Sequence, residues 1–170
     1  MIAIFVILLG ILSVGLVTCF CMIGVLGPRV DVSTTGELKE LDVELGTRVH
    51  VWPEPLSILG RIGGHTNLLI LSTICTTCNQ LASEIGSIPI DTPIRNLGFV
   101  VSCKSEIEGT SFVATHNLGT YPVLVDEGGL WTDSTFGIRK SPVCLNLNEH
   151  QLLRAAVTPD INTLLKAIKE

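Results

Sequence analysis

Charged residues are missing from the start of this 170-residue chain, since Met1 to Pro28 contains no Asp, Glu, Lys or Arg. The 11 basic and 16 acidic residues all lie beyond this leader, at a density compatible with a soluble domain. This division excludes a disordered, collagen-like or coiled-coil chain, because the remainder is large enough to bury its own core. A net charge of −5 argues against nucleic acid as a partner, because phosphate recognition needs clustered Lys and Arg.

The uncharged leader is long enough to span a membrane. Residues 2–26 would form a helix of about 38 Å, against about 30 Å of hydrocarbon core. A cleaved signal peptide is the alternative, but a basic segment before the apolar run and a small-x-small cleavage site after it are both absent. A lipoprotein anchor at Cys19 fits less well, because the apolar run continues past that cysteine. We therefore expect residues 1–28 to be one transmembrane anchor, which contacts the lipid bilayer through residues 2–26.

Residues 29–45 are polar and acidic, and we interpret them as a stalk leading into one domain over residues 46–170. Apolar runs typical of strands recur in that domain, separated by turn residues and by segments with helical spacing. We expect strands at 48–52, 68–73, 97–103, 122–126 and 141–147, helices at 79–85, 130–138 and 158–168 (capped by Thr158), a turn at 60–64 and a short helix or loop at 110–117. This alternation predicts an α/β domain with a central sheet covered on both sides.

One cysteine pair has the spacing of a reactive site. Cys75 and Cys78 lie between the buried run at 68–73 and the helix predicted at 79–85. At a helix N-terminus, unpaired N–H groups and the helix dipole stabilise a thiolate. Cys75 would attack a substrate disulfide, and Cys78, one turn later, would resolve the mixed disulfide. The alternatives are a structural disulfide and half of a metal site, for which a second pair at matching spacing is absent.

Three segments resemble the thioredoxin superfamily: residues 68–78, residues 121–126 (Tyr-Pro-Val-Leu-Val-Asp) and residues 136–143 (Phe-Gly-Ile-Arg-Lys-Ser-Pro-Val). The most similar branch is membrane-anchored and includes thioredoxin-like cytochrome-maturation proteins and the accessory protein for methylamine dehydrogenase maturation. The resemblance implies a thioredoxin-like fold, in which a central mixed sheet is flanked by helices, with no metal or other cofactor. It also implies that Ser141–Pro142 is a cis peptide beside the sulfurs, where it would pair with an extended substrate. Tyr121–Pro122 is the other candidate for a cis bond.

The chain departs from the family pattern at several positions. Ile74 stands where an aromatic residue is common, Thr76 and Thr77 where Pro or His is common, and Ser141 where Thr is common. Because the residues between the cysteines help to set the thiol pKa, the direction of electron flow stays open. Asp126 is a candidate for a buried proton acceptor, but we interpret it as a cap at the end of a strand.

The other cysteines and the histidines have no spacing typical of a site. We expect Cys103 and Cys144 to behave as buried small hydrophobes, the alternative being a second disulfide or an electron relay. The histidines show no ligand spacing and are interpreted as surface or capping residues.

These patterns together predict a membrane-tethered thiol–disulfide oxidoreductase that exchanges electrons with protein cysteines through Cys75 and Cys78. Its partners would be a client protein with cysteines or a disulfide and a membrane electron donor or acceptor. Arg29 and Lys39 give a faint bias towards a cytoplasmic body. Disulfide chemistry is most useful outside the cytoplasm, however, so we expect a single-pass bacterial membrane protein with an extracytoplasmic domain. The alternatives are a non-catalytic docking subunit of a membrane assembly and a metal carrier using the same cysteines.

Overall fold

The structure is a computed structural model, and it describes residues 38–89 and 94–169. The predicted transmembrane anchor and most of the predicted stalk lie outside these residues. Within the described ranges, no helix combines the length and the apolar character needed to cross a membrane.

A mixed six-stranded sheet, with strand order β1-β6-β5-β2-β3-β4, forms the centre of the domain. Its strands are β1 (Lys39–Glu40), β2 (His65–Ser72), β3 (Leu97–Cys103), β4 (Val123–Glu127), β5 (Val143–Asn148) and β6 (Gln151–Val157). β1 lies inside the segment interpreted as a stalk, so the sheet begins before residue 46. β2, β3 and β4 are parallel, whereas β5, β6 and β1 join antiparallel. The segments that follow the three parallel strands therefore all leave the sheet at the carboxyl ends of these strands.

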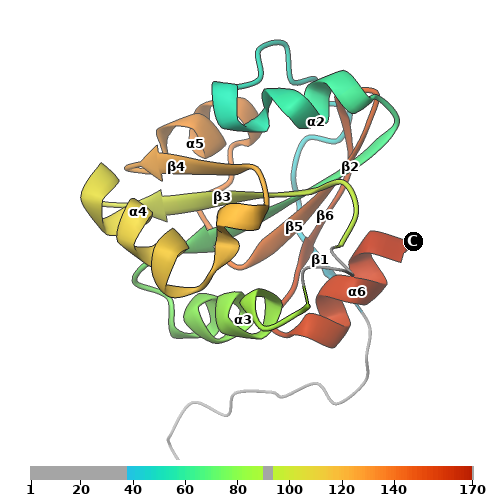
Figure 1. The fold of residues 1–170 in the computed structure, drawn as a ribbon. Coiled ribbons are helices and arrows are strands. Elements are labelled where there is room, and N and C mark those ends of the chain that lie inside the picture. The colour runs from blue at the N-terminus through green and yellow to red at the C-terminus, as the bar shows by residue number, and fades with distance from the viewer. Residues whose placement is uncertain (1–37, 90–93, 170) are drawn as a thin grey trace, which may run out of the picture. The chain divides into compact units, whose positions relative to one another are not determined.

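Helices cover both faces of the sheet (Figure 1). One core layer receives side chains from the helices α3 (Thr76–Gly86), α4 (Glu106–Thr115) and α6 (Ile161–Lys169). The other core layer receives side chains from α2 (Ser57–Ile62) and α5 (Leu130–Phe136). The domain also contains two 3-10 turns, η1 (Glu54–Leu56) and η2 (Leu118–Thr120). The strand β2 supplies both layers, because alternate side chains point to opposite faces. Leu69 and Leu71 belong to the α3-side layer, and Leu68 and Ile70 to the α5-side layer. The predicted α/β domain with a sheet covered on both sides is confirmed.

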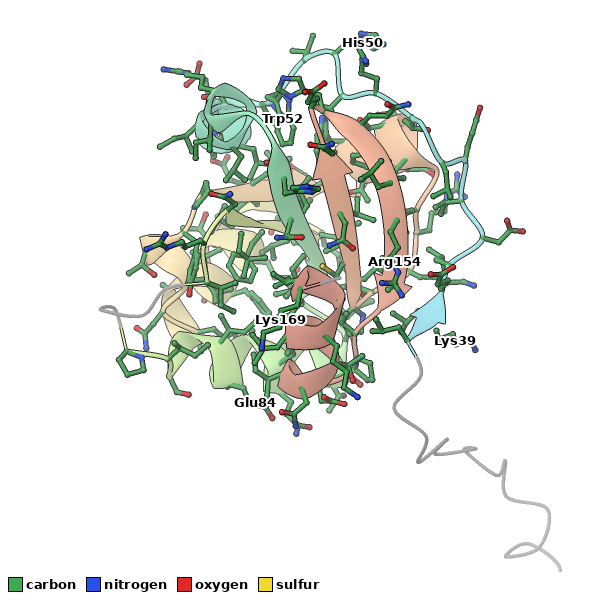
Figure 2. The ribbon with its side chains drawn as sticks, turned by 90° about the vertical axis from the view of Figure 1, so that its right-hand side faces the viewer. Lys39, His50, Trp52, Glu84, Arg154 and Lys169 are labelled. Carbon is green, nitrogen blue, oxygen red and sulfur yellow. The ribbon has the colours of Figure 1, made fainter. Side chains whose placement is uncertain are left out.

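Two predictions between residues 48 and 64 are wrong. The alternating segment 48–52 is not a strand, since Arg48 makes only one isolated bridge, to Gln151. Its apolar side chains pack instead: Val49 is buried, and Trp52 lies against α2 (Figure 2). The predicted turn at 60–64 is largely helix α2, with Gly60 inside it. Gly60 leaves room for that packing, because a Cβ there would lie 2.8 Å from Trp52 Cδ1.

The C-terminal third contains one strand that the sequence analysis did not predict. β6 follows β5 through a hairpin in which Glu149 and His150 have positive φ, 49° and 69°. Such hairpins are usually signalled by Asn-Gly or Asp-Gly, which this turn lacks. The predicted cap of the last helix is also wrong, because Asp160 Oδ1, and not Thr158, accepts the N–H of Thr163 at 2.8 Å.

Candidate active site

The two cysteines of the predicted pair lie where β2 ends and α3 begins. Cys75 is the N-cap residue of α3, with extended backbone angles (φ −93°, ψ 117°), and its Sγ accepts the N–H of Cys78 at 3.3 Å. The sulfur thus occupies the place that a Ser or Asp oxygen takes in common helix caps. This places a backbone donor on the sulfur atom that carries negative charge once the thiol loses its proton.

Cys78 has different surroundings from Cys75. Its side chain is fully buried, whereas Cys75 is partly exposed. Burial, together with the hydrogen bond to Cys75, raises the pKa of Cys78 to about 12. At neutral pH, Cys78 is therefore a protonated thiol in the interior, and Cys75 offers the accessible sulfur. This difference in access suits Cys75 as an attacking sulfur and Cys78 as a resolving sulfur.

The Ser141–Pro142 segment meets the cysteines at the start of β5. Its peptide bond is cis, the geometry that the resemblance implied, and it is the only cis bond among the described residues; Tyr121–Pro122 is trans. The carbonyl oxygen of Ser141 lies 3.9 Å from Cys75 Sγ and accepts its S–H, across 66 positions of sequence. The fold thus brings together the cysteine pair and the proline segment that the sequence analysis selected.

We expect Cys75 to be the reactive thiol of the reduced domain. Burial raises the pKa of Cys78 and of Cys144 to about 12, and burial also raises the pKa of Cys103. At pH 8, a thiol with a pKa near 12 is ionised only about once in ten thousand molecules. Iodoacetamide should therefore modify Cys75 at least about a hundredfold faster than Cys78 and Cys144, and faster than Cys103, as measured by peptide mass mapping. Unfolding in urea, as the control, should make all four react, and similar labelling of Cys78 in the folded protein would contradict the assignment.

A chain of polar contacts that the sequence analysis missed supports the cysteine loop. Asn79 Nδ2 donates to the carbonyl oxygens of Thr73 at 3.3 Å and Cys75 at 2.9 Å. Its Oδ1 lies 3.2 Å from His116 Nε2, whose ring Nδ1 lies 2.9 Å from the hydroxyl of Ser83. Burial lowers the pKa of His116, and a neutral ring can donate from Nε2 and accept at Nδ1. His116 is also the C-cap residue of α4, in agreement with its interpretation as a capping residue.

Two carboxylates near the carboxyl ends of the parallel strands have structural partners. Asp126 accepts the N–H groups of Trp131 at 2.9 Å and Thr132 at 3.0 Å, and the hydroxyl of Thr132 at 2.6 Å. Its interpretation as a cap is confirmed, since it holds the first turn of α5. Glu108 accepts a hydrogen bond from the hydroxyl of Thr73, which no sequence signal indicated. In the part of the chain that the structure describes, no carboxylate hydrogen-bonds to Cys78.

Cys103 and Cys144 are buried free thiols, which confirms their interpretation as small hydrophobes. Cys144 lies on β5 in the α3-side layer. Cys103 lies at the end of β3, where α4 passes so closely that a Cβ on Gly109 would be 2.8 Å from its Sγ. Within residues 38–89 and 94–169, no group of three or more His, Cys, Asp or Glu side chains is placed to hold a metal ion.

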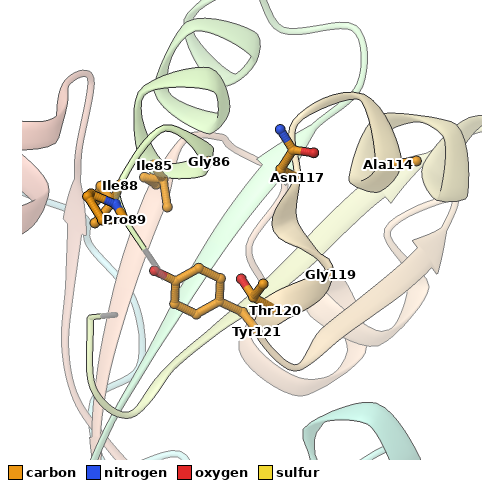
Figure 3. Close-up of a pocket in the computed structure, with 9 residues that line it drawn as sticks. All are labelled: Ile85, Gly86, Ile88, Pro89, Ala114, Asn117, Gly119, Thr120 and Tyr121. Atoms are coloured by element: carbon orange, nitrogen blue, oxygen red, sulfur yellow. The ribbon is translucent and has the colours of Figure 1, made fainter. Parts of the chain in front are cut away.

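A hollow of about 560 Å³ lies at the C-terminal end of α3 (Figure 3). Cys75 lies at the other end of this helix. Ile85, Gly86 and Tyr121 are among the residues that line the hollow. An α-helix rises 1.5 Å per residue, so roughly 15 Å separate its α3 wall from Cys75. A small molecule confined to this hollow would therefore not reach the sulfurs.

Comparison with known proteins shows the fold. The chain matches no model of a protein family and no curated protein. Among solved structures, it resembles StoA from Bacillus subtilis, with a TM-score of 0.50 and 18% identity over 75% of this chain and 96% of that one. A thioredoxin-like protein from Aeropyrum pernix has a TM-score of 0.50 and 16% identity, over 75% of this chain and 88% of that one. A DsbF homologue from Corynebacterium diphtheriae has a TM-score of 0.50 and 15% identity, over 79% of this chain and 88% of that one. The chain therefore has a thioredoxin-like fold, as its sequence predicted.

Proposed function

We propose that this protein is a thiol–disulfide oxidoreductase that exchanges electrons with the cysteines of client proteins. The observation that carries this proposal is the pairing of a partly exposed Cys75, which accepts a backbone N–H at the start of α3, with a buried Cys78 one turn later. A structural disulfide would need no such difference in access between its two sulfurs. The thioredoxin-like fold agrees with the proposal.

The proposed reaction with an oxidised client has two steps. The Cys75 thiolate attacks one sulfur of the client disulfide, so that a mixed disulfide forms and the other client sulfur leaves as a thiolate. Cys78 then loses its proton and attacks Cys75 Sγ, which releases the first client sulfur as a thiolate. The client gains two electrons and, once its thiolates are protonated, two protons, while Cys75 and Cys78 become a disulfide. The reverse sequence oxidises a client dithiol.

Ser141 and Pro142 would form the docking point for the client backbone. Pro142 has no N–H group, and the carbonyl of Ser141 already faces Cys75 Sγ. An extended client segment that hydrogen-bonds to the Ser141 backbone would therefore hold its own cysteine next to Cys75.

The uncharged leader suggests where the reaction takes place. In this proposal, residues 2–26 tether the domain to a bacterial cell membrane as a single span, and the domain faces the extracytoplasmic side, where disulfides persist. A membrane electron donor or acceptor would then return the cysteine pair to its starting state after each client.

A redox titration tests the proposed function. The full chain, kept in solution with a non-ionic detergent, is equilibrated in glutathione or dithiothreitol buffers, and its thiols are trapped and counted by mass spectrometry. We expect Cys75 and Cys78 to titrate together as one two-electron couple. A midpoint near −270 mV would indicate a reductant, and one near −120 mV an oxidant. A pair that never cycles would reject the proposal in favour of the docking subunit, and bound metal would favour the carrier.

A further inference from the structure

A polar pocket of about 300 Å³ adjoins the Ser141–Pro142 segment. Its polar lining comes from the ends of β2 and β3, the helix α5 and the segment before β5: Ser72, Ser102, Thr132, Asp133, Arg139, Lys140 and Ser141. Its volume is at the lower end of the range for small-molecule sites, and is enough for one side chain.

The pocket and the sulfurs lie towards opposite faces of the sheet. On β2, Ser72 follows Ile70 by two positions, and Ile70 belongs to the α5-side core layer, whereas Cys78 belongs to the α3-side layer. Ser141 lies between the two sites, because it lines the pocket while its carbonyl oxygen is 3.9 Å from Cys75 Sγ. A client segment that docks along Ser141 would therefore reach both.

Two hydroxyl groups in the pocket are free to bind a ligand. Ser72 and Ser102 stand opposite each other on adjacent strands, and neither hydroxyl hydrogen-bonds to any residue in the described ranges. Gly129, with φ +68°, leaves the hydroxyl of Ser102 accessible from the pocket, because a Cβ on residue 129 would lie 3.1 Å from Ser102 Oγ. Hydroxyl groups that point into such a space can donate to an acceptor.

The charged side chains that line the pocket are Asp133, Arg139 and Lys140, which together carry a net charge of +1. Arg139 and Asp133 neutralise each other through two hydrogen bonds of 2.8 Å. Lys140, which is exposed, forms no ion pair with the described residues. Since the whole chain carries a net charge of −5, any attraction for an acid at this place has to come from this local group.

We propose that this pocket binds an acidic side chain directly next to the reacting cysteine of the client, an inference that rests on the proposed function. Successive side chains of an extended segment point to opposite faces. When the client cysteine faces Cys75, the residues before and after it therefore face the pocket. A carboxylate there accepts hydrogen bonds from Ser72 and Ser102 and meets the ammonium group of Lys140. The favoured substrates are thus polypeptides with Asp or Glu adjacent to a cysteine.

The test compares two disulfide-linked peptide dimers that differ only in Glu or Gln beside the cysteine. The reduced full chain in non-ionic detergent reacts with each dimer, and each rate is divided by the rate of the same dimer with dithiothreitol, which removes the intrinsic reactivity of the peptide. We expect the Glu peptide to react about fivefold faster, the size of one partly exposed ion pair. Lys140→Gln should reduce this ratio to about one, and Ser102→Ala should reduce it in part. Lys169→Gln, which removes a charge at the end of α6 (Figure 2), should leave it unchanged.

The outcomes separate this inference from the proposed function. Equal normalised rates for both peptides with the wild-type chain would overturn the pocket and leave the exchange reaction intact. A preference for Glu that survives both Lys140→Gln and Ser102→Ala would overturn it as well. If neither peptide reacts with Cys75, the proposed function fails and the pocket proposal fails with it.

Discussion

Replacing Gly86 by alanine is expected to lower the free energy of unfolding by about 2–3 kcal/mol, although alanine usually favours a helix. Gly86 ends α3 where it meets the end of α4. A Cβ at this position would lie 1.9 Å from the carbonyl oxygen of His116 and 2.9 Å from its carbonyl carbon. These are backbone atoms, and the His116 ring also contacts Asn79, so the clash has no flexible side chain to absorb it.

Urea unfolding of the full chain in non-ionic detergent measures this effect. Both tryptophans of the chain, Trp52 and Trp131, lie in the described domain and report on its unfolding. Gly119→Ala is the matched control, because no atom lies within 4 Å of a Cβ there. It should change the stability by less than about 0.5 kcal/mol. If Gly86→Ala unfolds at the wild-type urea concentration, the close packing of α3 on the end of α4 is not as described.

Replacing Cys75 by serine is expected to reduce thiol–disulfide exchange to the uncatalysed rate. A serine oxygen forms no disulfide, and Cys78 cannot substitute for the missing thiol, because it is buried and its pKa is raised to about 12. The measurement is the rate at which the reduced full chain consumes a peptide disulfide at pH 7. Cys144→Ala is the control, since this buried thiol belongs to the core, and it should keep the wild-type rate. Exchange by Cys75→Ser above a tenth of the wild-type rate would place the nucleophile elsewhere.

Most of the sheet follows from patterns that the sequence carries locally. The strand predicted at 97–103 has those bounds in the structure, because its unbroken apolar run is buried on both faces. Elements without such a local signal were missed. β6 contains adjacent alanines and follows a turn without glycine, and its strand character comes from pairing with β5. Segment 48–52 alternates like a strand, but its antiparallel bridge from Arg48 meets β6 at Gln151, where β6 begins, so the residues after Arg48 have no strand residue to pair with.

The candidate site divides in the same way between local and distant contacts. Cys75 and Cys78 are predictable because the sequence shows two cysteines, separated by two residues, at the start of a predicted helix. Ser141–Pro142 is predictable because it matches a family pattern. The contact between Asn79 and His116 joins residues 37 positions apart, and that between Thr73 and Glu108 joins residues 35 apart. Neither pair leaves a spacing signal, since it depends on how α3 and α4 pack.

Trapping the mixed disulfide with the Cys78→Ser variant tests most directly whether Cys75 attacks and Cys78 resolves. In this variant the attack can proceed, but no thiol is placed to release the client. After incubation of the reduced full-length variant with a peptide disulfide, we predict one covalently bound peptide per chain, attached to Cys75 by peptide mapping. The absence of any adduct, or an adduct on Cys103 or Cys144 instead, would contradict the proposed reaction.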